Sequence, residues 1–149
     1  MAKYSLAKYT LTVKIPQSVA SLFGTSVITL GGSNSYTGSI SVEHNANLWE
    51  VVGDATGSHV FNRNDDKTGN IDVQINQLSD KVRQLKTLIN VYRSSQTIED
   101  GLTLEIHDSL GNTICTAEDC MPQKTPNQTF ENTAQMQTWR FVCGEITIY

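Results

Sequence analysis

The sequence predicts a mainly β protein with one α-helix: an antiparallel β-sandwich or small barrel with the helix on its flank. Three observations lead to this fold class. Several segments alternate apolar and polar residues, which is the pattern of a strand with one buried face. One segment repeats apolar residues at three- and four-residue intervals, as a helix covering a sheet does. Strands and helices do not alternate along the chain, so a parallel sheet built from βαβ units is not expected.

Strands are predicted wherever apolar and polar side chains alternate. Residues 9–15 alternate most strictly, with an aromatic or aliphatic residue at every second position and Thr or Lys between. Pro16 ends this strand, because proline has no N–H to donate to a neighbouring strand. Residues 48–52 fit either a further strand or a short helical turn. The same alternation places the other strands of the body at residues 26–30, 38–43, 70–75, 102–108, 113–117 and 138–149.

Glycine-containing turns separate several of these strands. We expect one turn at residues 31–34 and a second at residues 109–112, where it would join two strands as a hairpin. The last strand differs from the others because both of its faces carry apolar residues. It is therefore predicted to be central or to be buried against a neighbouring subunit. Gly144 is expected to hold a bulge that moves the buried side chains to the other parity.

One helix is predicted, and it begins after Ser79. Ser79 is a natural N-cap, and Asp80 suits the positive end of the helix dipole. Apolar residues then recur every three or four positions from Val82 to Tyr92. We expect this helix to cover one side of the sheet.

A long polar segment, residues 53–69, interrupts the strand pattern. It is rich in turn residues, and only Val60 and Phe61 are large and apolar. Loops of this length inside a compact domain are usually functional or disordered, and the apolar pair argues against disorder. We therefore predict an extended hairpin or arm that reaches away from the body, within a single domain of residues 1–149.

Composition and charge exclude several classes of function. The formal net charge is -4, and no three Lys or Arg residues are adjacent, so tight binding of DNA or RNA is disfavoured. Passive contact with DNA remains compatible with a mildly acidic chain. The first residues lack the apolar core of a signal peptide, and no window approaches the ~18 apolar residues that span a bilayer. We expect synthesis in a cytoplasm and no membrane insertion.

No catalytic residue, metal site or cofactor is predicted, and we expect a protein that is not an enzyme. The histidines lie in neither a His-x-x-x-His nor a Gly-x-Ser-x-Gly motif. These histidines are His44, His59 and His107. A zinc site built from His107 and the cysteines is disfavoured, because Cys115 and Cys120 are spaced more widely than in structural zinc sites. The Asn- and Asp-rich residues 62–66 lack the final acidic ligand of an EF-hand loop.

The chain has three cysteines: Cys115, Cys120 and Cys143. In a reducing compartment they are expected to be free thiols. Cys115 and Cys143 fit strands as small buried hydrophobic residues. A disulfide that forms once the protein has left the cell stays open as an alternative.

The central block of the sequence, residues 53–85, resembles the tail-tube proteins of contractile-tailed bacteriophages. The shared pattern is a polar loop, Asn-Asp followed shortly by Gly, a strand, a Gln-x-Ser step and a helix with Leu near its middle. The positions that match are Asn64, Asp65, Gly69, Gln77, Ser79 and Leu85. The order of elements fits over roughly residues 8–108, and the C-terminal part matches by strand pattern alone.

This resemblance implies a structural subunit of the phage virion. Copies would form hexameric rings, and the rings would stack into a hollow tail tube inside a contractile sheath. DNA would pass through the tube without specific binding. The implied partners are further copies of the chain, the tail sheath protein, the baseplate and the tail-terminator protein, with assembly in the host bacterial cytoplasm. No cofactor is implied.

Two groups of residues are candidates for these roles. The arm would contact the next subunit or ring through Asp54, His59, Val60, Phe61, Arg63, Asn64, Asp65, Asp66 and Lys67. The lumen candidates are Glu43, Asp72 and Glu105, which lie opposite apolar faces on three predicted strands. A carboxylate lining would repel phosphates and let DNA slide. Ordinary acidic residues on the outer surface are the alternative interpretation.

Other functions fit parts of the same pattern. An inner-tube subunit of a tailocin or another contractile injection system would differ only in its cargo. A monomeric β-sandwich module that binds a ligand would instead be a stable monomer with exposed aromatic residues at one loop edge. A small enzyme on a β-scaffold would need the convergent reactive groups that the sequence lacks.

Overall fold

The computed structural model describes residues 9–31 and 37–149, and over these residues the chain forms nine strands and two helices. The turn predicted at residues 31–34 falls almost entirely outside the described residues. In chain order the elements are β1 (Thr10–Lys14), α1 (Gln17–Phe23), β2 (Val27–Gly31), β3 (Thr37–His44), β4 (Trp49–Gly53), β5 (His59–Arg63), β6 (Gly69–Asn76), α2 (Asp80–Ser94), β7 (Leu102–His107), β8 (Thr113–Pro122) and β9 (Met136–Ile148).

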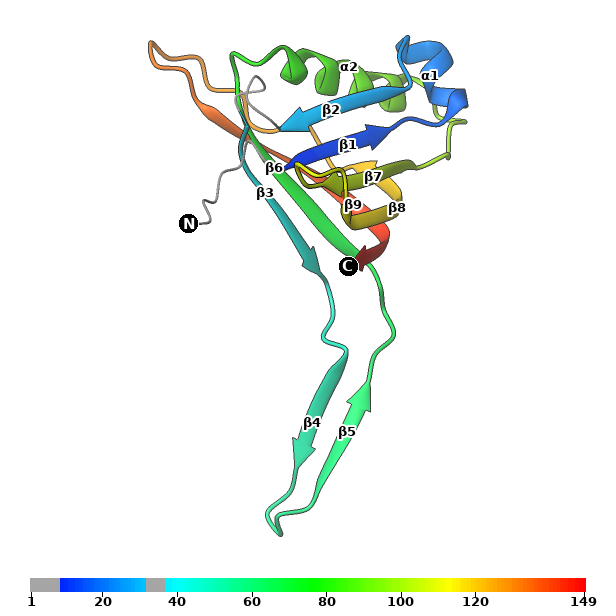
Figure 1. Cartoon of the computed structure of the whole chain (residues 1–149), viewed down its shortest axis with the longest axis vertical. Helices are drawn as coiled ribbons and strands as arrows, with labels where there is room; N and C mark the ends of the chain where they lie inside the picture. Colours follow the sequence, from blue (N-terminus) through cyan, green and yellow to red (C-terminus); the bar gives the residue numbers. More distant parts are fainter. Residues whose placement is uncertain (1–8, 32–36) are drawn as a thin grey trace.

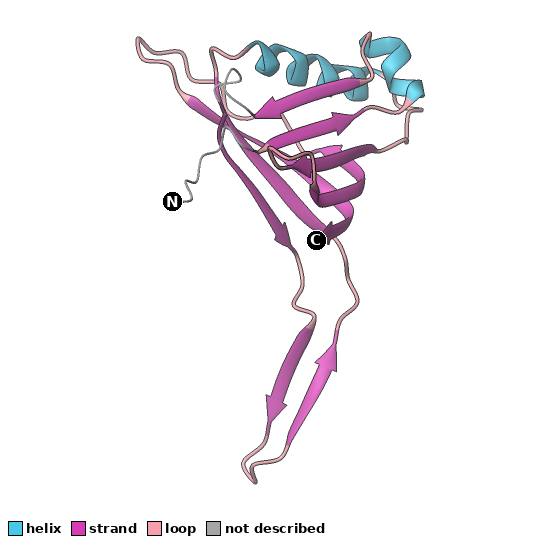
Figure 2. Cartoon of the chain, in the orientation of Figure 1, coloured by secondary structure: helices cyan, strands magenta, loops and turns pink. Residues whose placement is uncertain are grey.

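Seven of the strands form one antiparallel sheet in the order β2-β1-β7-β8-β9-β6-β3. The sheet curls into half of a barrel, and the two helices lie at one end of it (Figures 1 and 2). β4 and β5 form a separate two-stranded ribbon that projects from the opposite end (Figure 1). The predicted mainly β fold with a flanking helix is therefore confirmed. Within the segment 48–52, the residues from Trp49 on belong to the strand β4, so the helical-turn alternative is wrong.

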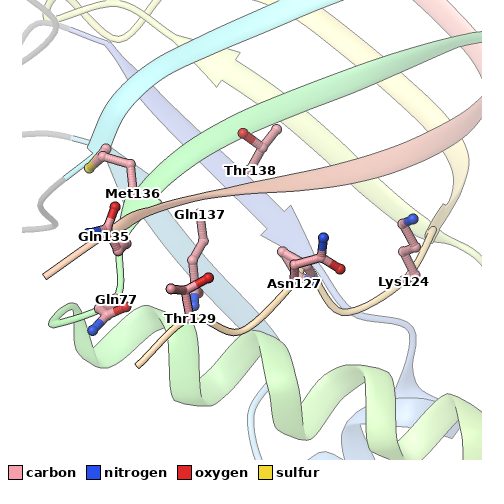
Figure 3. A pocket seen from close by; sticks show the side chains of 9 residues that line it. Gln77, Lys124, Asn127, Thr129, Gln135, Met136, Gln137 and Thr138 are labelled. Carbon is pink, nitrogen blue, oxygen red and sulfur yellow. The ribbon is translucent and has the colours of Figure 1, made fainter. Parts of the chain in front are cut away.

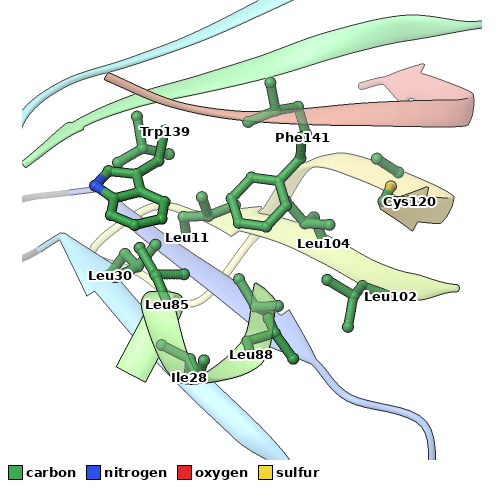
Figure 4. Close-up of a cluster of buried hydrophobic side chains, with 14 of the residues drawn as sticks. Leu11, Ile28, Leu30, Leu85, Leu88, Leu102, Leu104, Cys120, Trp139 and Phe141 are labelled. Carbon is green, nitrogen blue, oxygen red and sulfur yellow. The ribbon is translucent and has the colours of Figure 1, made fainter. Parts of the chain in front are cut away.

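The core lies inside the curl of the sheet. Trp139 and Phe141 of β9 point into it, toward Leu11 of β1 and Leu85 of α2 (Figure 4). The strands β1, β2, β6 and β7 each bury one parity of their side chains, as the alternation in the sequence predicts; β6, for example, buries Gly69 and every second residue after it. Burial of large apolar side chains contributes about 1.5–3 kcal/mol each, so this one-sided core supplies most of the driving force for folding.

The predicted helix is confirmed as α2. The Ser79 hydroxyl accepts a hydrogen bond from the Lys81 N–H at 3.3 Å, which makes Ser79 the N-cap. Four side chains on one face of α2 are buried: Val82, Leu85, Leu88 and Ile89. Their three- and four-residue spacing is the periodicity that the sequence shows.

The sequence pattern does not predict α1. This helix has seven residues and buries only Val19, so it is too short for a hydrophobic period to be visible. Pro16 precedes it, and proline suits the start of a helix as well as the end of a strand. Gly24 ends the helix with φ +100°, and its N–H donates to the Ala20 carbonyl at 2.8 Å. The expectation of a single helix was therefore wrong.

β9 changes its buried parity at Gly144, as predicted. Cys143 is buried and pairs with Gly69, whereas Ile146 is the next buried residue and donates its N–H to the Lys67 carbonyl at 3.0 Å. Between Cys143 and Ile146, β9 therefore contains one residue more than the segment of chain that it pairs with, which is a β-bulge. Asp119 of β8 lies beside Gly144 and has φ +56°, so the neighbouring strand is irregular at the same place.

Replacing Leu85 with Ala tests the core packing of α2. Leu85 is 1 % exposed, so the substitution should leave a cavity and lower the free energy of unfolding by about 2–5 kcal/mol in urea titrations. Leu78→Ala is the matched control, because Leu78 precedes the same helix and is 69 % exposed. It should change stability by less than about 0.5 kcal/mol. Equal losses in the two variants would contradict the packing described.

Candidate assembly surfaces

The ribbon of β4 and β5, residues 49–63, stands away from the body and is called the arm below (Figure 1). Its register pairs Trp49 with Arg63 and Gly53 with His59. Asp54 forms the tip: its Oδ1 accepts hydrogen bonds from the N–H and hydroxyl of Thr56 at 2.9 and 2.7 Å. These bonds hold the pKa of the Asp54 carboxyl below its usual range. Asp54 therefore shapes the turn.

The arm exposes apolar side chains on both faces. Trp49, Val51, His59, Phe61 and Arg63 share one face, called the aromatic face below. On it, the His59 and Phe61 rings meet edge to face with centroids 5.3 Å apart, and the Arg63 guanidinium lies 5.6 Å from the Trp49 ring centroid. Val52 and Val60 pair on the opposite face.

This exposure distinguishes the arm from the body. Its large apolar side chains are each 53–62 % exposed, and all ten residues of its two strands are exposed. A two-stranded ribbon without a covered face is marginally stable in water. Contiguous exposed apolar groups of this kind are typical of surfaces that bind another protein.

The base of the arm is held by polar side chains that bond to one another. Asn64 Oδ1 accepts from the Asp66 N–H at 3.0 Å, and Asp66 Oδ1 accepts from the N–H and hydroxyl of Thr68. The bonds from Thr68 lower the pKa of Asp66. Arg63 Nε donates to Asp65 Oδ1 at 2.6 Å. These predicted contact residues thus have local structural roles.

Lys67 ties the arm to the sheet. Its Nζ lies 3.5 Å from Glu145 Oε1 of β9. On the other side of the base, the Asn45 N–H donates to the Thr68 carbonyl at 3.0 Å, and Asn70 Nδ2 donates to Asn45 Oδ1 at 3.2 Å. The two strands that feed the arm are therefore linked where they leave the body.

Sequence reasoning missed the β4 half of the aromatic face. Trp49, Val51 and Val52 alternate like a strand of the body, and nothing in the local sequence shows that this strand lies outside the core. The available signal is that β4 and the segment around Phe61 flank a turn, Asp-Ala-Thr-Gly, and can pair as a hairpin.

The three acidic lumen candidates lie on the outward face of the sheet, opposite the core, on β3, β6 and β7. Two of them are paired within the chain. Asp72 accepts two hydrogen bonds from Arg140, at 2.8 and 3.0 Å, and this pairing raises the pKa of Arg140. Glu105 lies 3.0 Å from Lys14 Nζ and 3.1 Å from His107 Nε2. Glu43 lies on the last strand of the sheet and makes no ion pair with the described residues.

The described residues contain several open pockets. The groove between the start of β9 and the loop that precedes it is lined mainly by neutral polar side chains and has a volume of about 400 Å³ (Figure 3). Gln137 reaches into it and donates to Gln128 Oε1 at 3.1 Å. Within residues 9–31 and 37–149, no three His, Cys, Asp or Glu side chains are placed to hold a metal ion. No helix in this part of the chain is long and apolar enough to cross a membrane.

Comparison with known proteins identifies the family of this chain. Residues 1–149 match the family described as Bacteriophage PhiTE tail tube protein. A search of curated protein sequences finds no match.

Three solved structures share the fold at low sequence identity. A chain of the sheath-tube complex of the extracellular contractile injection system PVC is 11 % identical, with a TM-score of 0.54 over 99 % of this chain and 91 % of that one. A chain of the PVC sheath/tube terminator is 12 % identical, with a TM-score of 0.55 over 100 % and 98 %. A chain of the anti-feeding prophage baseplate is 9 % identical, with a TM-score of 0.51 over 100 % and 97 %.

Replacing Glu105 with Gln should make the thermal stability of the protein depend less on pH under acidic conditions. The hydrogen bond from Lys14, followed by the contact with His107, holds the pKa of Glu105 below its ordinary value of 4.5. A lowered folded-state pKa gives stability that is fully present above the unfolded pKa and is lost as pH falls through the folded pKa. The melting temperature of the wild-type protein should therefore decrease as the pH is lowered below about 4.5. The melting temperature of the variant should decrease less over the same range.

Glu50→Gln is the control for this experiment, because Glu50 is an exposed carboxylate on the arm. Thermal melts of all three proteins between neutral pH and about pH 3 make the comparison. The Glu50 variant should follow wild type. Parallel profiles for wild type and Glu105→Gln would show that the pair with Lys14 contributes no stability.

Proposed function

We propose, from the premise that this chain belongs to the bacteriophage PhiTE tail tube protein family, that it stacks with copies of itself into the hollow tube of a contractile tail. The family is one of structural proteins of phage tails. In this proposal the whole chain, residues 1–149, is one tube domain that carries the arm. Copies form hexameric rings, and DNA passes through the stacked rings without specific binding. The subunit has no enzymatic role.

The observation that carries this proposal is the uncovered arm. A ribbon with five large apolar side chains in solvent gains stability only when another surface covers it. The chain's own body lies at the other end of the molecule from the arm tip (Figure 1). A neighbouring subunit or ring supplies the missing surface. Val60 and Phe61 then make the contact, together with Trp49, Val51 and Val52 of the paired strand.

The edges of the sheet support assembly in a second way. In the described part of the chain, β2 and β3 are the end strands of the sheet, so each has one strand neighbour. Unpaired edges invite pairing with another chain. Because the contacts between ring neighbours are head to tail, the β3 edge of one subunit and the β2 edge of the next meet in a closed ring.

The outward face of the sheet supplies the lumen in this proposal. Glu43, Asp72 and Glu105 lie on that face, and their charge keeps phosphates from binding. The tail sheath protein, baseplate and tail-terminator protein contact other parts of the tube. Assembly takes place in the cytoplasm of the host bacterium, and the finished tube is part of the virion.

A second candidate is the inner tube of a contractile injection system that carries no DNA. The fold shared with the PVC tube complex favours it, because that chain is matched over 91 % of its length. The same rings and arm contacts are expected there, and only the contents of the tube differ. A monomeric ligand-binding module is the outcome that would remain if no assembly were seen.

Phe61→Asp should prevent tube formation while leaving the body folded. The substitution places a charge in the apolar contact that the arm makes, and desolvating it there is costly. Negative-stain electron microscopy and light scattering should show rings or tubes for wild type and monomers for the variant. Leu110→Asp is the control: Leu110 is 84 % exposed in the turn between β7 and β8. Tubes formed equally by both variants would refute the role of the arm.

Glu43→Lys should impair DNA delivery without preventing assembly. Glu43 is the candidate of choice because changing it removes no ion pair within the described chain. The new positive charge would bind phosphates and slow DNA in the tube. Phage carrying Glu43→Lys should assemble tails of normal length and show reduced infectivity. Glu99→Lys, in the connection between α2 and β7, makes the same charge change elsewhere, and normal infectivity in both would contradict the lumen assignment.

A further inference from the structure

Two of the three cysteines face each other across neighbouring strands. Cys120 of β8 and Cys143 of β9 are direct partners in the antiparallel register. Both side chains point into the core, where Cys120 is 0 % and Cys143 is 4 % exposed (Figure 4 labels Cys120). Both are unbridged thiols in this structure.

The backbone geometry at this pair suits a disulfide. Directly opposed residues of an antiparallel pair have Cα atoms about 4.5 or 5.5 Å apart, depending on the type of pair. Disulfides span Cα separations of about 4.4–6.8 Å, so either type can be bridged without moving the strands. Cys115 provides the contrast within the same sheet, because its strand partners are Ile106 and Ile148.

We propose that Cys120 and Cys143 form an oxidation site that closes to a disulfide when the protein meets a peroxide outside the reducing cytoplasm. In the first step the thiolate of one cysteine of the pair attacks one oxygen of hydrogen peroxide, the O–O bond breaks, and hydroxide leaves; that cysteine becomes a sulfenic acid. In the second step the sulfur of the other cysteine attacks the sulfenic sulfur, the S–O bond breaks, and water is released. Overall, two thiols and one peroxide give one disulfide and two waters.

The two thiols interact with each other inside the core. The interaction with the Cys120 thiol lowers the pKa of Cys143, and the same interaction, together with burial, raises the pKa of Cys120. The contact between the two thiols thus favours the ionised form of one member of the pair, which is the form that reacts with a peroxide. Access requires a local opening of the strands, and the irregular residues Asp119 and Gly144 directly adjoin the two cysteines.

The bridge would fasten the connection between β8 and β9. It closes a loop of about two dozen residues, which includes the irregular segment before β9. A constraint of this size should raise the melting temperature by roughly 5–10 °C. A protein that folds reduced in a cytoplasm would thus gain stability after release into an oxidising environment.

The test is to oxidise the full-length folded protein with hydrogen peroxide and count the thiols that remain. After quenching, the protein is denatured and alkylated, its mass is measured intact, and disulfides are mapped in non-reduced peptides. Wild type should lose two of its three alkylatable thiols, with one bridge mapped to Cys120 and Cys143. The oxidised form should melt at a higher temperature, and a reductant should reverse the shift.

Three variants make the result specific to the pair. Cys115→Ala should still form the bridge, whereas Cys120→Ala and Cys143→Ala should form no intramolecular disulfide. If an alanine variant fails to fold, the peptide map of the wild-type protein still shows which cysteines are bridged. A bridge that includes Cys115, or three intact thiols in folded wild type under conditions that bridge the unfolded chain, would overturn the proposal. Because the readout is a covalent bond in the isolated chain, it does not depend on tube assembly.

Discussion

The structure depends on β9, the strand that joins the two halves of the curled sheet. β9 pairs with β8 along one edge and with β6 along the other, so the sheet is continuous only through it. It also contributes Trp139 and Phe141, the largest fully buried side chains of the core. At Gly144 this strand gains one residue, and Asp119 of β8 beside it has φ +56°, so the two central strands bend locally at the same place.

One-sided burial explains what could be predicted from the sequence. A strand with one face in a core must alternate, so β1, β6 and β7 are visible as patterns. The helix α2 is visible for the same reason at a different period, and Ser79 marks its start because the first helical N–H groups need an acceptor. The helix α1 is not visible as a pattern because it is only seven residues long and Val19 is its one fully buried residue. The pairs Lys14–Glu105 and Asp72–Arg140 were also beyond sequence reasoning, since they depend on the order of strands in the sheet.

The residues predicted from the sequence to contact a neighbouring subunit are of two kinds: polar residues that shape the arm, and exposed apolar residues. Asp54, Asn64 and Asp66 have their acceptor atoms occupied by neighbouring N–H and hydroxyl groups, so they give the arm its shape. The apolar residues of the arm have no such internal partners, and the energy of covering them is still available for binding. The sequence pattern predicts an extended hairpin or arm at these residues, and local hydrogen bonds at its tip and base give the ribbon a defined direction. A preformed arm loses less conformational entropy on binding than a disordered one would.

The ion pairs on the outward face limit how acidic a tube lined by that face can be. Glu43, Asp72 and Glu105 carry three negative charges, and Lys14 and Arg140 place two positive charges beside them, so this cluster has a net charge of about minus one per subunit at neutral pH. The paired charges stabilise the register of β1 with β7 and of β6 with β9. A row of unpaired carboxylates would repel DNA more strongly, but like charges on adjacent strands would oppose folding of the sheet. Glu43 is less affected by this conflict because it lies on the last strand of the sheet and has only one strand neighbour, and its charge also acts favourably on Arg140. In the proposed ring, repetition of the Glu43 charge would supply the repulsion of DNA that a single subunit lacks.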